Sequence, residues 1–154
     1  MPPPLTVDAV DLSRYAGTWH EIARLPNVYE RACVSQPSAT YTPGADGIAV
    51  TNRCLTRSGR LRVSQGLARV VPGSAGSRLK VTFVPSWLRW VDAVWADYWI
   101  LDLDANYQVA LVGTPRRDAM WLLAREPELD DAHRGRLLRV ALEQGYDVQR
   151  LQFS

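Results

Sequence analysis

The sequence predicts an all-β fold: one antiparallel, up-and-down barrel of eight strands, with a single C-terminal α-helix packed outside it. Three observations predict it. A chain of 154 residues suits one domain with a sizeable core. Eight short strand-like segments lie between residues 17 and 125, separated mostly by short turns, which favours antiparallel order over parallel strands joined by helices. After Pro127 the apolar periodicity becomes helical. We therefore treat residues 1–154 as one domain.

The expected strands alternate with turn residues, most clearly at Pro43-Gly44-Ala45-Asp46-Gly47. Eight strands can close into a barrel whose interior holds one small ligand. Alternation sends every second residue inward, but in the last two strands both halves are apolar, so alternation alone does not set the phase. The expected strands span residues 17–25, 34–42, 48–56, 60–71, 79–84, 97–103, 107–113 and 119–125.

The segments that flank the strands have their own signals. Residues 1–10, which begin with three prolines, are expected to be a loosely ordered lead-in, and residues 148–153 alternate and suit a final strand. A helix is expected to start after Asp130 or Asp131 and to end at Gly145. Its apolar face carries Leu137, Leu138, Ala141 and Leu142.

Composition and motifs exclude several function classes. With 18 basic and 16 acidic residues the net charge is +2, too small to indicate nucleic-acid binding. No apolar run is long enough to span a membrane, and the N-terminus as printed has no secretion signal. The two histidines, His20 and His133, are far apart, and no zinc, calcium, phosphate-binding or nucleophile motif is present. We expect no metal, no cofactor and no enzymatic activity.

Three segments, in order, carry a family resemblance: Gly17-Thr18-Trp19, then Asp97-Tyr98, then Arg125 in the last strand. Together they resemble the lipocalins, with the greatest likeness to the bacterial outer-membrane lipocalins and apolipoprotein D. The resemblance implies that Trp19 closes one end of the barrel and that Arg125 lies over its indole. Such a pair contributes about 0.5–2 kcal/mol. It also implies structural rather than ligand-binding roles for Gly17, Trp19, Asp97 and Arg125.

The resemblance also sets the phase of the strands and so implies a set of ligand-binding residues in the lumen. Small residues on one strand leave room, and Tyr41, Asn52 and Tyr98 offer hydrogen bonds to a ligand head group. A filled barrel without a cavity is the alternative. The implied ligand is a fatty acid or a lysophospholipid, held by a protein of the bacterial periplasm or outer membrane. The implied lumen residues are Ala39, Tyr41, Val50, Asn52, Gly66, Ala68, Val81, Phe83, Tyr98, Ile100, Ala110, Trp121 and Leu123.

One acidic residue, Glu21, is expected inside the barrel near the end that Trp19 closes, because it is two residues from Trp19 and alternation points it the same way. A buried carboxylate needs a partner, and Arg24 and Arg69 are the candidates. We interpret it as half of a structural ion pair rather than as a catalytic acid.

The only two cysteines are Cys33 and Cys54. If the turn is centred near Asp46, residues 39 and 50 pair roughly across it, and Cys33 lies almost opposite Cys54. A disulfide is therefore plausible in geometry and would indicate an oxidising compartment. Two thiols buried in the core are the alternative.

Residues 86–96 carry three tryptophans, Trp87, Trp90 and Trp95, and connect two strands at the rim. This segment could form a lid, a membrane-surface contact through Trp87 and Trp90, a partner interface, or a short helix packed on the barrel. Two other functions stay open: a lipocalin-fold enzyme using a lumen thiol or carboxylate on a hydrophobic substrate, and an interaction module using the Trp87–Trp95 rim. Both a monomer and a homodimer are compatible with the sequence.

Overall fold

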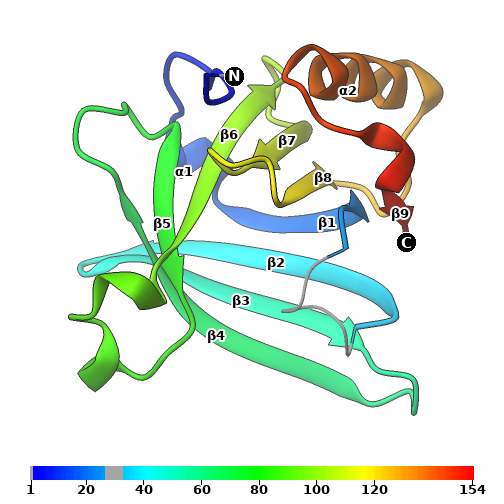
Figure 1. Ribbon diagram of the computed structural model, residues 1–154. Coiled ribbons are helices and arrows are strands. Elements are labelled where there is room, and N and C mark those ends of the chain that lie inside the picture. Colours follow the sequence, from blue (N-terminus) through cyan, green and yellow to red (C-terminus); the bar gives the residue numbers. More distant parts are fainter. Residues whose placement is uncertain (1, 27–32) are drawn as a thin grey trace.

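The strands form one closed antiparallel ring in the computed structural model, which describes residues 2–26 and 33–154 (Figure 1). Each strand pairs with its neighbour in sequence, and β1 closes the ring by pairing with both β2 and β8. The predicted eight-stranded barrel is confirmed. Its strands are β1 (Gly17–Arg24), β2 (Ser35–Gly44), β3 (Gly47–Leu55), β4 (Leu61–Val70), β5 (Arg78–Thr82), β6 (Ala96–Leu103), β7 (Val109–Gly113) and β8 (Met120–Ala124).

A ninth strand, β9 (Gln152–Phe153), pairs with the far end of β1. The expected final strand over residues 148–153 is therefore right only at its end. Its first half forms the short 3-10 helix η4 (Val148–Arg150), because the Asp147 carboxylate accepts a hydrogen bond from the Gln149 amide and turns the chain there.

Two α-helices flank the barrel, α1 (Leu12–Tyr15) and α2 (Asp131–Glu143). The side chain of Asp130 caps α2 by accepting a hydrogen bond from the His133 amide at 2.8 Å, so Asp130 rather than Asp131 is the cap. Figure 1 shows α2 lying along one side of the barrel, away from β2–β4. Two further 3-10 helices, η2 (Ser86–Leu88) and η3 (Asp92–Val94), lie between β5 and β6.

Apolar side chains form two separate clusters, one inside the barrel and one between the barrel and α2. Leu137 and Ala141 are buried in the outer cluster and Leu138 is partly buried there, as expected. Leu142 is 57% exposed, so its expected place on the buried face was wrong. It comes five residues after Leu137, which is about 140° around a helix of 3.6 residues per turn.

Because consecutive strands are antiparallel, their connections alternate between the two ends of the barrel. The β2–β3, β4–β5 and β6–β7 turns lie at the same end as α1 and the fully buried Trp19, which we name the closed end. The β3–β4, β5–β6 and β7–β8 connections (residues 56–60, 83–95 and 114–119) lie at the other end, which we name the mouth.

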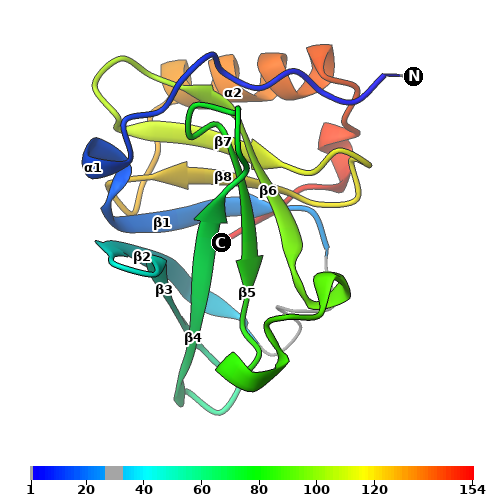
Figure 2. The same cartoon turned by 90° about the vertical axis from the view of Figure 1, so that its left-hand side faces the viewer.

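The N-terminal residues run along the barrel toward the end of α2 (Figure 2). The Val7 and Val10 amides donate to the carbonyls of Ile100 and Ala75 at 3.0 and 2.9 Å, and Leu5 exchanges two hydrogen bonds with the Gln144 side chain. The expected looseness of residues 1–10 concerns their motion and stays a prediction. In the structure residues 5–10 have specific partners.

Cys33 and Cys54 form a disulfide, with Cα atoms 5.5 Å apart. The alternative of two buried thiols was wrong. The register that suggested the bond was also wrong, since Ala39 pairs with Asn52 rather than with residue 50. An irregularity between Ser35 and Ser38 shifts the register near the start of β2 by one residue, and Cys33 lies just before β2, near the end of β3 that carries Cys54.

Reduction of this disulfide should lower the melting temperature. The bonded cysteines are 21 residues apart, and closing a loop of this size constrains the unfolded chain by about 3 kcal/mol. For a domain of this length that corresponds to roughly 6–12 °C. Thermal melts followed by circular dichroism, with and without reductant, measure the shift. The double variant Cys33→Ser/Cys54→Ser should melt low in both buffers; equal melting of reduced and oxidised wild type would contradict the prediction.

Candidate functional site: the barrel lumen

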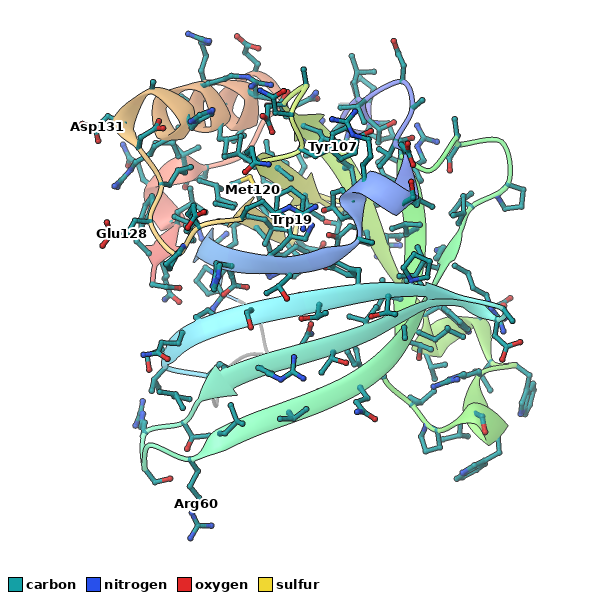
Figure 3. The ribbon with its side chains drawn as sticks, turned by 180° about the vertical axis from the view of Figure 1, so that it is seen from behind. Trp19, Arg60, Tyr107, Met120, Glu128 and Asp131 are labelled. Atoms are coloured by element: carbon teal, nitrogen blue, oxygen red, sulfur yellow. A yellow bond between two sulfur atoms is a disulfide. The ribbon has the colours of Figure 1, made fainter. Side chains whose placement is uncertain are left out.

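The closed end is built around Trp19, whose side chain is fully buried and whose indole nitrogen donates to the Tyr15 carbonyl at 2.8 Å (Figure 3). The Arg125 guanidinium carbon lies 3.9 Å from the centroid of that indole, as the resemblance implied. Arg125 also donates to the carbonyls of Tyr107, Thr18 and Arg14 at 2.8–3.1 Å. Partial burial lowers the pKa of Arg125 from its ordinary value, yet a guanidinium remains charged at neutral pH.

Gly17 is required by this packing. Its φ of +99° lies in a region that side-chain-bearing residues rarely adopt, and a Cβ there would approach Arg125 Nη1 to 3.3 Å. The glycine of the first motif therefore leaves space for the arginine of the third.

Three tyrosines form the floor of the lumen above Trp19. The hydroxyl of Tyr98 lies 2.6 Å from that of Tyr15 and accepts a hydrogen bond from Tyr41 at 2.9 Å. Burial raises the pKa of both Tyr15 and Tyr98 well above the ordinary value. The hydroxyls of Tyr41 and Tyr98, which we expected to offer hydrogen bonds to a ligand, also bind each other within the floor, and their role toward a ligand stays a prediction.

The wall of the lumen follows the predicted phase on every strand, including the two for which alternation was ambiguous. Ten of the expected residues belong to the inner apolar cluster: Ala39, Tyr41, Val50, Ala68, Val81, Tyr98, Ile100, Ala110, Trp121 and Leu123. The pairing register places Asn52 beside Ala39, and Gly66 beside Val50, on the same inner face.

Sequence reasoning missed other members of this wall. Ile48, Leu79 and Val112 are buried in the inner cluster, and each lies two residues from an expected lumen residue of its own strand. Continuing the alternation by one step would have found all three. Tyr15, in α1, was missed because it precedes the first strand and strand alternation does not reach it.

The space beside Gly66 is filled, which corrects the expectation that the small residues of β4 leave room. A Cβ on Gly66 would clash with the Thr82 carbonyl oxygen and would lie 2.7 Å from the Phe83 ring. Phe83 therefore packs over Gly66 while keeping 45% of its surface exposed at the mouth.

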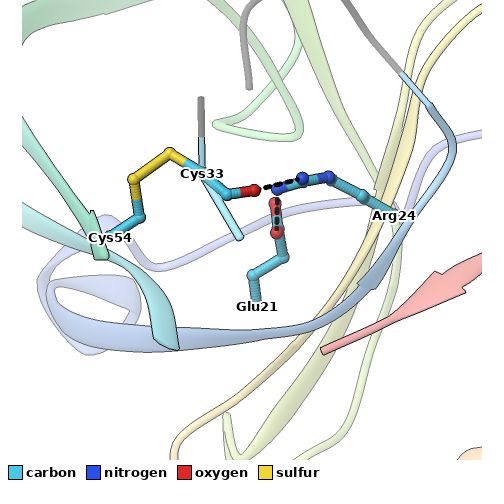
Figure 4. The surroundings of a disulfide bond; sticks show 4 residues. All are labelled: Glu21, Arg24, Cys33 and Cys54. Atoms are coloured by element: carbon cyan, nitrogen blue, oxygen red, sulfur yellow. Dashed lines mark hydrogen bonds and ion pairs between the residues drawn. A yellow bond between two sulfur atoms is a disulfide. The ribbon is translucent and has the colours of Figure 1, made fainter. Parts of the chain in front are cut away.

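Glu21 lies toward the mouth, 7% exposed, and forms an ion pair with Arg24 at 3.2 Å. A bulge in β1 between Glu21 and Ala23 puts Glu21 and Arg24 on the same face. Arg24 also donates to the Cys33 carbonyl at 2.9 Å, so the ion pair and the disulfide form one cluster (Figure 4). The expected structural pair is confirmed, with Arg24 rather than Arg69 as the partner. The expected place of Glu21 near the closed end was wrong, because β1 carries it away from Trp19 toward the mouth.

Asp97 of the second motif and Asp102, further along β6, form ion pairs with basic side chains of the protein outside the lumen. Asp97 pairs with Lys80 of β5 at 2.7 Å, and Asp102 pairs with Arg136 of α2 at 2.8 Å. The second pair joins the helix to the barrel wall. These contacts give Asp97 the structural setting that its motif implies.

Residues 2–26 and 33–154 contain neither a metal-binding cluster nor a membrane-spanning helix. No group of three or more His, Cys, Asp or Glu side chains is placed there to hold a metal ion. No helix in this part of the chain is long and apolar enough to cross a membrane.

Residues 10–154 match the family model of the lipocalin-like domain. Temperature-induced lipocalin-1 of Arabidopsis thaliana is 35% identical over 147 residues, covering 94% of this chain and 78% of that protein. Outer membrane lipoprotein Blc of Escherichia coli K12 is 34% identical over 146 residues, covering 94% and 78%. Apolipoprotein D of Mus musculus is 28% identical over 157 residues, covering 97% and 79%.

The solved structures agree on the fold. Insecticyanin from the tobacco hornworm Manduca sexta superposes with a TM-score of 0.76 at 20% identity, covering 99% of this chain and 84% of that one. The fold and the lumen thus define a small antiparallel barrel of the calycin type. The chain belongs to the lipocalin family, and the resemblance read from its three motifs is confirmed.

Replacing Arg125 by alanine should destabilise the protein. The change removes the stacking on Trp19 and the donors to three carbonyls, a loss of about 2–3 kcal/mol after allowing for partial exposure, or roughly 4–12 °C in melting temperature. Thermal melts measure it, and Arg116→Ala, at an exposed residue of the mouth, is the control. A collapse of ligand affinity at unchanged stability would show that Arg125 is not structural.

Alkaline pH should unfold the protein as its buried tyrosines are forced to ionise. In the unfolded chain a tyrosine loses its proton near pH 10, whereas the raised pKa keeps Tyr15 and Tyr98 protonated in the fold. The folded state then binds more protons, so stability is retained below about pH 10 and falls as the pH rises further. Tyrosinate absorbance and circular dichroism, followed together, measure this. Ionisation of all six tyrosines near pH 10 with the fold intact would contradict it.

Proposed function

We propose that the barrel binds a single-chain lipid, a fatty acid or a lysophospholipid, in its lumen and stores or carries it. The observation that carries the proposal is the cluster of apolar side chains that lines the inside of the barrel above the tyrosine floor. Trp121, Ala39 and Tyr98 belong to this wall yet stay partly exposed. Moving an acyl chain from water onto such a wall is favourable by about 0.8 kcal/mol per buried CH₂.

A single acyl chain suits the polarity along the lumen. The aromatic floor, with its hydroxyls bonded to one another, would receive the methyl end of the chain. Polar side chains lie nearer the mouth, where Asn52, Glu21 and Arg24 would lie beside a head group. The ligand-binding roles of the thirteen expected residues, Phe83 and Gly66 included, stay part of this proposal.

We place the protein in the bacterial cell envelope, in the periplasm or at the outer membrane. The disulfide supports an oxidising compartment. The printed names of the bacterial relatives describe outer-membrane lipoproteins, while the Arabidopsis relative shows that the family also occurs elsewhere. A membrane-surface contact through Trp87 and Trp90 is a further part of the proposal.

The enzyme alternative loses its thiol nucleophile, because both cysteines of the chain are in the disulfide. The remaining lumen carboxylate, Glu21, is held by Arg24. Binding therefore accounts for more of the site than catalysis does.

The variant Trp121→Arg should weaken lipid binding by roughly tenfold or more, because it places a charge where the acyl chain would lie. Ala49→Arg is the matched control: it adds the same charge to an exposed position on β3. Displacement of a fluorescent fatty acid measures affinity, and circular dichroism checks the fold. Equal affinity of the two variants would show that the lipid does not occupy the lumen.

Native mass spectrometry of the purified wild type, followed by lipid extraction, identifies a co-purified ligand and counts the protomers. About one acyl lipid per barrel supports the proposal. A wild type that neither retains nor takes up an acyl lipid would overturn it.

A further inference from the structure

The charges of the chain are distributed unevenly in sequence. Residues 47–91, which form β3, β4, β5 and the first part of the β5–β6 connection, contain eight basic residues and no carboxylate. Six of the eight are exposed. Lys80 is held by Asp97, and in the described part of the chain no other member of the group forms a salt bridge. The eight are Arg53, Arg57, Arg60, Arg62, Arg69, Arg78, Lys80 and Arg89.

The connection that follows β5 presents two tryptophans to solvent. Trp87 is 71% exposed and Trp90 is 80% exposed. The third tryptophan, Trp95, is folded inward: its indole nitrogen donates to the Arg89 carbonyl at 2.7 Å and Arg69 lies over its ring. Arg89 in turn donates to the Val84 carbonyl at 3.2 Å. The segment is thus held from within while its two outer indoles contact little of the protein.

The exposed tryptophans and several of the basic residues lie on connections at the mouth, spread along the side of the barrel that faces away from α2. Figures 1 and 2 show the β3–β4 turn and the β5–β6 connection projecting from the same side of the barrel, opposite α2, and Figure 3 shows Arg60 pointing away from the protein. The β3–β4, β5–β6 and β7–β8 connections carry five arginines against two aspartates. The arginines are Arg57, Arg60, Arg89, Arg116 and Arg117; the aspartates are Asp92 and Asp118.

We infer that the mouth docks on the surface of an anionic phospholipid bilayer. Tryptophan is favoured at the level of the lipid head groups, because its ring is apolar and its N–H is polar. Arginines beside it are attracted by an anionic surface, and this attraction falls off within a Debye length. Trp87 and Trp90 would enter the head-group layer, with Arg57 and Arg60 over lipid phosphates.

A bilayer fits these features better than a nucleic acid or a protein partner, because the apolar lumen opens at this same end of the barrel. The inference rests on the proposed function in this respect: a mouth held against a bilayer would let a single-chain lipid pass between membrane and lumen without crossing water. Docking itself needs no ligand in the lumen.

Vesicle sedimentation tests the inference with the full chain. Two sets of large unilamellar vesicles are compared, phosphatidylcholine alone and phosphatidylcholine with about 30 mol% phosphatidylglycerol, at about 50 and 500 mM salt. Wild type should sediment with the anionic vesicles at low salt, with a blue shift of tryptophan emission, and should be largely released at high salt. Failure to bind the anionic vesicles, or equal binding to both sets, would overturn the inference.

Matched variants locate the contact. Trp87→Ser/Trp90→Ser and Arg57→Gln/Arg60→Gln should each weaken vesicle binding by roughly tenfold or more. Leu142→Ser and Arg139→Gln/Arg150→Gln remove an exposed apolar side chain and two exposed charges from the α2 side, and they should bind like wild type. Rim variants that bind like these controls would overturn the inference.

Two further measurements separate the competing explanations. Trp121→Arg should still bind anionic vesicles while losing the fatty acid, so failure of the lumen proposal and failure of docking are distinguishable. Analytical ultracentrifugation without vesicles tests the rim for a second copy. A dimer that Trp87→Ser/Trp90→Ser dissociates would assign the surface to self-association and overturn membrane docking, as would equally tight, salt-sensitive binding of a single-stranded oligonucleotide.

Discussion

The structure depends on one interaction at the closed end, the Arg125 guanidinium lying over the Trp19 indole. Trp19 comes from the first strand and Arg125 follows the last, so the contact joins the two ends of the strand order where the barrel closes. The same guanidinium binds carbonyls from α1, β1 and the β6–β7 turn. Gly17 supplies the space, and the tyrosine floor rests on the result.

The second constraint is that β7 and β8 must be apolar on both faces. One face lines the lumen and the other packs against α2, so the five residues of β7 are all buried. Such a strand has no polar face that would have to point to solvent. The alternation of residues therefore does not show which set of side chains points into the lumen. Helix α2 thus covers the outer face of β7 and β8. Without it, a row of large apolar side chains on these two strands would face water. The Asp102–Arg136 pair holds the helix in that position.

Most of the fold and of the lumen wall could be predicted from the sequence. Turn residues and strand-length apolar segments identified eight strands, and the three motifs set the phase where alternation failed. The details that were missed arise from irregularities. A bulge at Glu21–Ala23 decides which arginine reaches Glu21, and an irregularity between Ser35 and Ser38 shifts the pairing near Cys33. Whether a bulge forms depends on tertiary contacts, so the local sequence does not predict its position.

The contacts that individual side chains make inside the lumen were predicted less well than the strands, for a different reason. Whether a hydroxyl faces a ligand or another hydroxyl depends on distances between strands remote in sequence, as for Tyr41 and Tyr98, which are 57 residues apart. The space beside Gly66 likewise depends on where the chain turns after β5, which brings Thr82 and Phe83 over that glycine. Alternation gives the direction of a side chain but not what it meets.

Net charge is a poor guide to the surface of this protein. The value of +2 is the difference between 18 basic and 16 acidic residues over the whole chain, yet all 16 acidic residues lie outside residues 47–91. Because those residues form consecutive strands of a meander, separation of charge along the sequence becomes separation of charge in space. A charged group acts over about one Debye length, roughly 8–10 Å in physiological salt, which is shorter than the length of a strand such as β3 or β4. A partner at the mouth therefore meets the local arginines and tryptophans, and the acidic residues around α2 do little to offset them.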